Sequence, residues 1–263
     1  MLGSWYVVMC CGVSGFELDE EQPHSATVAT TSASTTPLRM GGDGTRRGLA
    51  KLAAVDRWAT FDCYGTLIDW NGGIRGQLAR VFGEERADAL LVRYHGLEPE
   101  LEADGKLTYR EVLTEAMRRL GAPAGEEDAL AQSLPSWQPF PEVPAALMAA
   151  RGRGWKLALL SNTDPDYIEA SQAQLGVPFE LAIVSSEIGS YKPALGHWRA
   201  FEDQVGRLPD VHVAASLFHD VAPANELGLP SIWINRLGET AGPQPTRELA
   251  DLSRLADTLE ELA

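Results

Sequence analysis

The sequence predicts an α/β fold, a doubly wound parallel sheet that is interrupted after its first strand by an inserted helical segment. In the second half of the 263-residue chain, short apolar runs alternate with helical patterns, as in proteins built on a parallel sheet. Residues 71–138, by contrast, show helical patterning alone. The length is sufficient to bury a sizeable core in one or two domains.

The first 50 residues differ in composition from the rest. Residues 25–36 are almost entirely Ser, Thr and Ala, and the sequence GGDG follows at residues 41–44. Such a stretch buries too little apolar surface to offset the entropy lost on ordering, so residues 1–50 are predicted to be a disordered leader. The folded part is then a core made of residues 51–70 and 139–263, with the helical segment at residues 71–138 between them.

The first strand is predicted at residues 58–63, an apolar run that ends at a Tyr-Gly-Thr turn. In the helical segment, Thr108 and Glu111 form a capping-box pattern, and Gly121 ends the helix that they begin. A longer helix is predicted to carry its apolar side chains on one face: Leu90, Leu91, Tyr94 and Leu101.

Strands and helices alternate after the helical segment. Further strands are predicted at residues 156–160, 181–185, 214–218 and 231–235. Helices are predicted to begin at Asp164-Pro165 and at Lys192-Pro193, with proline at the first helical position. A segment inserted directly after the first strand overhangs the carboxyl ends of the strands, where open α/β sheets bind their ligands.

The chain is strongly acidic, with 22 basic and 37 acidic residues and a formal net charge of −15. Nucleic acids are polyanions that bind basic surfaces, so the charge disfavours a nucleic-acid partner. The same field repels a small anionic substrate, and a site for one therefore needs cations of its own. No membrane span is expected, because the apolar run near the N-terminus is too short. The cysteines, Cys10, Cys11 and Cys63, have no disulfide or zinc spacing, which favours a reduced, cytoplasmic protein.

The most informative motif is FDCYGTL at residues 61–67. Its carboxylate, Asp62, leaves a buried strand at the carboxyl edge of the sheet and enters a turn that contains glycine. A carboxylate in that position can act as a nucleophile, because it divides one difficult displacement into the formation and the hydrolysis of an ester. Thr66 is close enough in sequence to orient the oxygens of Asp62.

Three further polar motif positions follow at or just beyond predicted strand ends: Ser161-Asn162, Lys192 in SYKP and Asp220 in FHDVAPAN. Together with Asp62 and Thr66, their order and spacing resemble the haloacid dehalogenase superfamily over residues 55–260. The resemblance implies a hydrolase with a Rossmann-like core and a helical cap formed by residues 71–138. It also implies that Ser161 and Asn162 hold a carboxylate oxygen or the developing charge.

Tyr64 stands two residues after Asp62, where phosphatases of this superfamily typically carry a second aspartate that protonates the leaving group. Tyrosine, with a reference pKa of about 10, cannot replace that acid near pH 7. A halide leaving group needs no proton. The pattern D-x-Y-G-T resembles the type II L-2-haloacid dehalogenases, and this resemblance implies displacement of halide from a short 2-haloacid through an ester on Asp62.

The same resemblance implies roles for further side chains. Arg93 lies 31 residues after Asp62, at the position where these dehalogenases bind the substrate carboxylate, and a guanidinium can pair with a carboxylate through two parallel hydrogen bonds. Lys192 beside Asp62 favours the ionised nucleophile and lowers its pKa. Trp198 is expected to form the pocket wall together with Tyr64, although it also lies on an apolar helical stripe that is typical of a core.

Asp220 leaves a second function open. In the phosphatases an aspartate at this position binds magnesium together with the nucleophile, so the alternative is a magnesium-dependent phosphatase of a small phosphorylated metabolite, with Asp62 and Asp220 as ligands. In the dehalogenase hypothesis no cofactor is needed, and Asp220 pairs with Lys192 or activates water. A non-catalytic binding protein is a third hypothesis. A small anionic substrate is the expected partner, and a homodimer is expected from the relatives.

Overall fold

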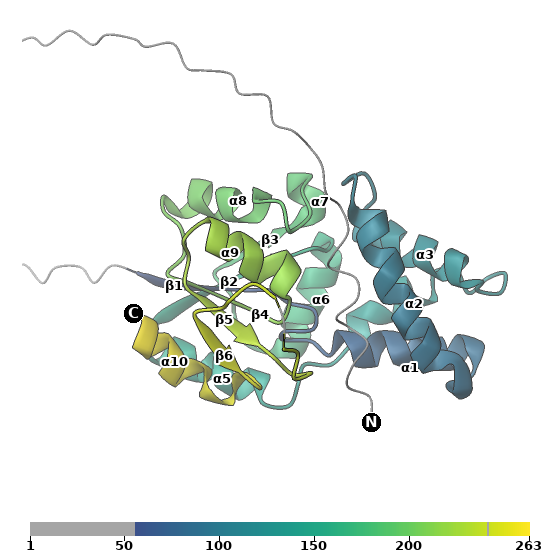
Figure 1. Cartoon of the computed structure of the whole chain (residues 1–263), viewed down its shortest axis with the longest axis horizontal. Coiled ribbons are helices and arrows are strands. Elements are labelled where there is room, and N and C mark those ends of the chain that lie inside the picture. The colour runs from purple at the N-terminus through teal and green to yellow at the C-terminus, as the bar shows by residue number, and fades with distance from the viewer. Residues whose placement is uncertain (1–55, 241) are drawn as a thin grey trace, which may run out of the picture. The chain divides into compact units, whose positions relative to one another are not determined.

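A computed structural model describes residues 56–240 and 242–263 (Figure 1). The predicted leader at residues 1–50 lies outside these residues. The described chain contains a six-stranded sheet in the order β3-β2-β1-β4-β5-β6, in which every neighbouring pair is parallel. The strands are β1 (Arg57–Phe61), β2 (Trp155–Ser161), β3 (Leu181–Val184), β4 (Val211–Ala214), β5 (Ser231–Ile234) and β6 (Arg247–Leu249). The parallel order confirms the predicted α/β fold.

The chain order of the sheet reverses at β1, with β2 and β3 on one side of it and β4, β5 and β6 on the other. Phe61, the last residue of β1, pairs with Leu159 on β2 and with Val213 on β4. The backbone N–H of Asp62 continues the ladder by donating to the Val213 carbonyl at 3.1 Å. Asp62 therefore lies at the carboxyl edge of the sheet and at the topological switch point, where open α/β sheets bind ligands.

Helices cover both faces of the sheet because alternate side chains of its strands are buried on opposite sides. On β2, Leu157 and Leu159 join the core cluster of α5 (Val143–Gly152), α6 (Pro165–Leu175) and α10 (Leu255–Leu262). Ala158 and Leu160 join a second cluster with residues of α8 (Gly196–Val205) and α9 (Ala222–Glu226). The short helix α7 (Ser185–Ile188) follows β3. Burial on both faces is what a doubly wound sheet requires.

Between β1 and β2 the chain forms four helices, which we call the inserted helices: α1 (Trp70–Phe82), α2 (Glu84–Glu102), α3 (Tyr109–Leu120) and α4 (Ala129–Ser133). Figure 1 shows α1, α2 and α3 grouped beside the sheet. The predicted capping box is confirmed: Thr108 accepts from the Glu111 backbone N–H, and Glu111 accepts from that of Thr108. Gly121 ends α3 with a left-handed backbone, φ +86°, which glycine adopts at little cost.

The predicted apolar stripe of the longer helix corresponds to α2. Leu90, Tyr94 and Leu101 are buried, and Leu91 packs against the same core cluster while partly buried. The proline-initiated helix at Asp164-Pro165 is α6, which begins at Pro165. Among the described residues, no helix is both long and apolar enough to cross a membrane.

Two predicted elements are wrong. The strand expected at residues 214–218 lies at Val211–Ala214. Residues Leu217–Val221 form a π-helical turn in which the Val221 N–H donates to the Ser216 carbonyl at 3.2 Å, and the Ser216 hydroxyl accepts from the His219 N–H at 3.0 Å. Lys192-Pro193 does not open a helix: its peptide bond is cis, and α8 begins only at Gly196. The short edge strand β6 was not predicted, since its Arg-Glu-Leu sequence is mostly exposed and has no apolar alternation.

Candidate active site

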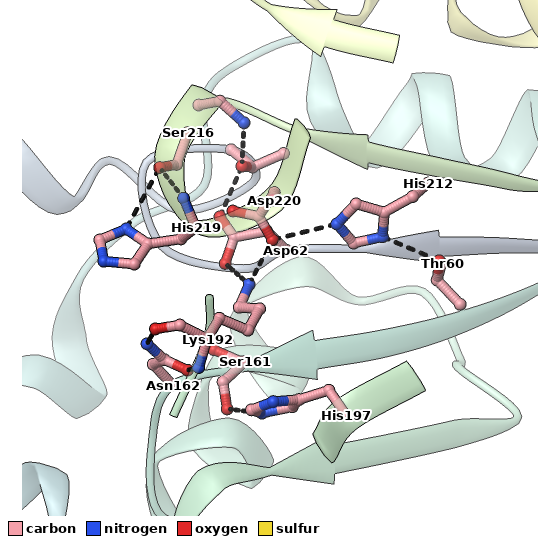
Figure 2. A network of polar contacts seen from close by, with 12 residues as sticks. Thr60, Asp62, Ser161, Asn162, Lys192, His197, His212, Ser216, His219 and Asp220 are labelled. Carbon is pink, nitrogen blue, oxygen red and sulfur yellow. Dashed lines mark hydrogen bonds and ion pairs between the residues drawn. The ribbon is translucent and has the colours of Figure 1, made fainter. Parts of the chain in front are cut away.

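Asp62, Lys192 and Asp220 meet at the carboxyl edge of the sheet, as the motif order predicted (Figure 2). The Lys192 ammonium donates to Asp62 Oδ1 at 2.9 Å and to Asp220 Oδ1 at 2.6 Å. The Lys192 and Asp220 side chains are 2% and 1% exposed, whereas Asp62 retains 12%. Of the three, Asp62 is therefore the group that a ligand can reach.

The turn after β1 holds the second oxygen of Asp62. Thr66 donates its hydroxyl to Asp62 Oδ2 at 2.6 Å and accepts from the Ala215 backbone N–H at 2.8 Å. Gly65, which lies between Asp62 and Thr66 in the chain, has φ +83°. A residue with a side chain would be strained in this conformation. Thr66 thus ties the turn after β1 to the end of β4 and orients the carboxylate, as predicted.

Asn162 fixes the backbone of the lysine. Its Oδ1 accepts from the Lys192 N–H at 2.7 Å and its Nδ2 donates to the Lys192 carbonyl at 3.1 Å. The preceding residue, Ser161, accepts at its carbonyl from His197 Nε2 at 3.0 Å, and its hydroxyl has no hydrogen-bond partner within the described chain. Asn162 therefore positions Lys192 rather than contacting Asp62 directly.

A histidine that was not predicted from the sequence hydrogen-bonds Asp220. His212 on β4 is fully buried, and its Nε2 lies 3.0 Å from Asp220 Oδ1, while its Nδ1 lies 2.9 Å from Thr60 Oγ1 (Figure 2). An ionised carboxylate can only accept, so a neutral imidazole carries its hydrogen on Nε2 and accepts from Thr60 at Nδ1. The one signal in the sequence is a histidine inside the apolar run VHVA.

The charges of this network are coupled. Burial acts to raise the pKa of Asp220. The Lys192 charge and the hydrogen bond from His212 outweigh this effect and hold that pKa well below its usual range. Burial alone acts to lower the pKa of Lys192, but the two carboxylates raise it. Burial raises the pKa of Asp62, and the Asp220 charge adds to this rise against the effect of Lys192. Lys192 lowers the pKa of Asp62, as predicted, but desolvation raises that pKa by more.

The inserted helices contribute polar side chains that were not predicted. Glu98 Oε1 on α2 accepts from the hydroxyls of Tyr94 and Tyr109, each at 2.9 Å. Glu102, one turn further along α2, accepts from Asn162 Nδ2 at 3.2 Å and so joins α2 to the Lys192 segment. The only sequence signal is the spacing of Tyr94, Glu98 and Glu102 by four residues, which places them on one side of a helix.

Tyr64 lies between the sheet edge and the inserted helices. Its ring stacks on Tyr109 with centroids 6.1 Å apart and meets Trp137 edge to face at 6.2 Å. Its hydroxyl lies 3.0 Å from Ser171 Oγ on α6. Burial raises the pKa of Tyr64 well above its usual range, so it does not supply an acid near neutral pH.

Two predicted substrate-binding residues do not join the group. Arg93 is exposed, and its guanidinium donates to the Arg119 carbonyl at 3.5 Å. The neighbouring Tyr94 is the buried member of the α2 stripe, so Arg93 is turned about 100° away from it. Trp198 is fully buried in the second core cluster, with its ring 5.2 Å from that of His212, and forms no pocket wall.

The donor set does not fit the magnesium ion of the alternative hypothesis. The Lys192 ammonium already bonds one oxygen of Asp62 and one oxygen of Asp220. Thr66 takes the other Asp62 oxygen, and only Asp220 Oδ2 lacks a hydrogen-bond partner in the described chain. Across those same residues, no three His, Cys, Asp or Glu side chains are grouped to hold a metal ion.

Known proteins agree with the motif analysis. A family model for haloacid dehalogenase-like hydrolases matches residues 57–215. The chain is 29% identical over 220 residues to the (S)-2-haloacid dehalogenase of Pseudomonas sp. (strain YL), an alignment that covers 77% of this chain and 94% of that protein. It is also 29% identical over 181 residues to the phosphoserine phosphatase of Thermus thermophilus, which covers 65% of this chain and 72% of that protein.

The fold agrees with solved structures. The L-2-haloacid dehalogenase from Xanthobacter autotrophicus with chloropropionic acid covalently bound matches with a TM-score of 0.69 at 20% identity, over 80% of this chain and 100% of that chain. At this identity the likeness concerns the fold. The family model, however, covers more than half of the chain. The resemblance read from the motifs is confirmed, and the chain belongs to the haloacid dehalogenase-like hydrolases.

Proposed function

We propose that this protein is a hydrolase that displaces halide from short 2-haloacids through an ester on Asp62. The observation that carries the proposal is a partly accessible carboxylate, held at both oxygens by Lys192 and Thr66, with Tyr64 rather than an acid two residues later. The similarity to an (S)-2-haloacid dehalogenase over most of both chains supports the same activity.

In the first step, an Asp62 oxygen attacks the halogen-bearing carbon from the side opposite the halogen. The new C–O bond forms as the carbon–halogen bond breaks, the halide leaves with the bonding electrons, and the centre is inverted. Thr66 and Lys192 restrict the rotation of the carboxylate, so that it is held ready for attack. No proton is required by the leaving group, which is consistent with Tyr64 at this position.

In the second step, water attacks the Asp62 carbonyl carbon. The acyl C–O bond breaks, the product leaves as a 2-hydroxyacid, and the water oxygen remains in the regenerated carboxylate while a proton is released. Asp62 carries no charge while it is an ester. Lys192 then keeps its partner Asp220, at 2.6 Å, so that no buried ammonium is left unpaired.

The inserted helices are proposed to act as a cap over Asp62, with Tyr64 and Tyr109 between cap and core. This division places the core at residues 51–70 and 139–263 and the cap at residues 71–138. The reaction needs no metal or organic cofactor. A cytoplasmic location and a homodimer stay predictions.

A magnesium-dependent phosphatase is the second candidate function. It is favoured by Asp220 and by the similarity to a phosphoserine phosphatase. It is opposed by the Lys192 ammonium, which already bonds both Asp62 and Asp220, and by the lack of an acid at Tyr64. The dehalogenase proposal accounts for both features, so we favour it.

A paired assay separates these functions. Halide release from (S)-2-chloropropionate in EDTA is measured beside phosphate release from p-nitrophenyl phosphate with magnesium. The proposal expects halide release without metal, and phosphate release alone would contradict it. A single turnover in heavy-oxygen water should label the Asp62 carboxylate. Label found only in the product would instead indicate direct attack by water.

A further inference from the structure

The inserted helices bring two carboxyl groups toward the Asp62 side of the candidate active site. Glu98 and Glu102 lie one turn apart on α2. Glu98 accepts from Tyr109, whose ring stacks on Tyr64, and Glu102 accepts from Asn162, which bonds the backbone of Lys192. In addition to burial, the Asp62 charge raises the pKa of both glutamates. Among the described residues, Lys192 is the one buried Lys or Arg, and Asp220 already shares it with Asp62.

This excess of carboxyl groups would repel an anionic substrate unless one of the carboxyl groups retains its proton. If Asp62, Asp220, Glu98 and Glu102 were all ionised around a single lysine, the carboxylate of a 2-haloacid would add to an excess of negative charge. Arg93 cannot compensate, because it is exposed and bonded to a backbone carbonyl elsewhere on the inserted helices. A desolvated carboxyl near other carboxylates tends to keep its proton, since both desolvation and like charge disfavour ionisation.

Hydrogen bonds determine where Glu98 carries that proton. The Trp70 indole N–H can only donate, and it donates to the Tyr109 hydroxyl oxygen at 3.0 Å. The Tyr109 hydrogen is then directed at Glu98 Oε1, which also accepts from Tyr94. These donors occupy both lone pairs of Oε1. Oε2 has no partner in the described part of the chain, so a proton on Glu98 sits there and is available to a ligand.

We propose that Glu98, as a neutral carboxylic acid, binds the substrate carboxylate by donating a hydrogen bond from Oε2. The inference rests on the proposed function, since it places a 2-haloacid beside Asp62. Glu98 and the substrate carboxylate then share one proton, and the acid end is recognised without an arginine. Affinity for the anion is therefore lost when Glu98 ionises.

The groups around Glu98 make it the one that titrates near neutral pH. Burial, with the Asp62 charge, raises its pKa to about 7 against the hydrogen bonds of its two tyrosines. The other titratable or charged groups around it are Tyr94, His95 and Glu102 on α2, Tyr109 on α3, Tyr191 and Lys192 before α8, and Asp62. Burial lowers the pKa of His95 to about 4 and raises those of Glu102 and the tyrosines. Asp62 must be ionised to attack, so its titration reduces activity on the acid side instead.

The test measures kcat and KM for halide release from 2-chloropropionate between pH 5.5 and 9, with the neutral 2-chloropropionamide as matched substrate. For the wild type, KM for the acid should rise about tenfold per pH unit above about pH 7, because one proton is coupled to binding. KM for the amide should stay flat. Glu98→Gln keeps a permanent N–H donor, so its KM for the acid should be flat within about threefold.

Control variants locate the effect. Glu100→Gln changes an exposed glutamate of the same helix, 3.7 Å from Arg119, and should keep the wild-type profile. Glu98→Ala removes the donor and should raise KM for the acid about tenfold at pH 6. If Glu98→Ala does not fold, as judged by circular dichroism, the near-isosteric Glu98→Gln decides the test.

Several outcomes overturn the inference. A wild-type KM that is flat with pH, or an alkaline rise that survives in Glu98→Gln, excludes Glu98 as the coupled group. Loss of the rise in Glu102→Gln alone would assign the role to Glu102. A lower kcat with unchanged KM in Glu98→Gln would make it a proton-transfer group. Absence of halide release by the wild type at every pH is a different result, which rejects the proposed function and the inference together.

Discussion

The core side and the helix side of the candidate active site are built in opposite ways. On the core side, the charged groups Asp62, Lys192 and Asp220 are paired with opposite charge, and His212 hydrogen-bonds Asp220 (Figure 2). On the helix side, Glu98 is held by tyrosine hydroxyls and Glu102 by an amide, and no cation of the described residues is bonded to either.

This contrast separates two tasks. Paired charges orient the nucleophile, and the two carboxylates raise the pKa of Lys192, so that the ammonium keeps its charge near neutral pH. Unpaired carboxyls in a desolvated place respond to pH and to the charge of a ligand. The core side is therefore suited to the chemical steps, and the helix side to recognising the substrate.

The largest expected effect comes from Asp62→Asn, which removes the nucleophile but keeps the shape of the side chain. We expect kcat for halide release to fall at least about 10³-fold with the fold intact. Asp203→Asn, an exposed aspartate on α8, should retain full activity. Substantial turnover by the Asp62 variant would mean that the core side does not carry the reaction.

Lys192→Met tests the charge pairing of the core side. Removing the cation leaves Asp62 and Asp220 buried and unpaired, and we expect a loss of about 3–5 kcal/mol in the free energy of unfolding at pH 7. The loss should shrink toward pH 4, because both carboxyls can then bind protons in the folded state. Urea unfolding measures both values. Lys156→Met, which changes a partly exposed lysine paired with Asp56, should cost less than about 1 kcal/mol. A loss that is independent of pH would contradict the pairing argument.

His212→Phe tests the support of Asp220. His212 touches no substrate, and we expect it to act by positioning, so that kcat falls about 10- to 100-fold through the lost charge-assisted hydrogen bond. KM should change little. His212→Asn can still donate to Asp220 and should recover part of kcat. Equal kcat values for the two variants would show that only packing at this position matters.

Glu98→Gln tests the helix side through stability rather than activity. The folded-state pKa of Glu98 is raised from 4.5 to about 7, so its stability contribution is fully present below pH 4.5 and is lost as the pH rises through 7. Glutamine does not titrate. Because Glu98 is partly exposed, we expect the variant to gain only about 1 kcal/mol over the wild type at pH 8 and nothing at pH 4. Parallel stability curves from urea unfolding would contradict the raised pKa.

The smallest effect is expected for Arg93→Ala. The side chain is exposed and bonded to a carbonyl of its own helical region, so stability should change by less than about 0.5 kcal/mol. KM for 2-chloropropionate should stay within about twofold of the wild type. A tenfold increase in KM would mean that Arg93 binds the substrate from the helix side, and the contrast between the two sides would no longer hold.

Residues at strand ends could be predicted from the sequence alone. Asp62, Thr66, Asn162, Lys192 and Asp220 each follow or adjoin a short apolar run, and parallel strands bring their carboxyl ends to one edge. Local pattern and chain order are sufficient for this step. The fold class, the insertion after β1 and the charge constraint on an anionic ligand follow in the same way.

The side chains that decide recognition depend on tertiary packing. Arg93 and Tyr94 are adjacent in sequence, but about 100° of helix rotation separates them, and the burial of Tyr94 turns Arg93 toward solvent. Trp198 likewise packs in the core, with its ring against that of His212.

Glu98 and His212 acquire their importance only from partners that are distant in the chain. Tyr109 lies on another helix from Glu98, and Thr60 lies on another strand from His212. The sequence by itself determined the nucleophile, its lysine and the sheet that unites them. Only the tertiary structure decided which charges are paired and which are left unpaired, because desolvation and hydrogen bonding depend on neighbours that no local pattern specifies.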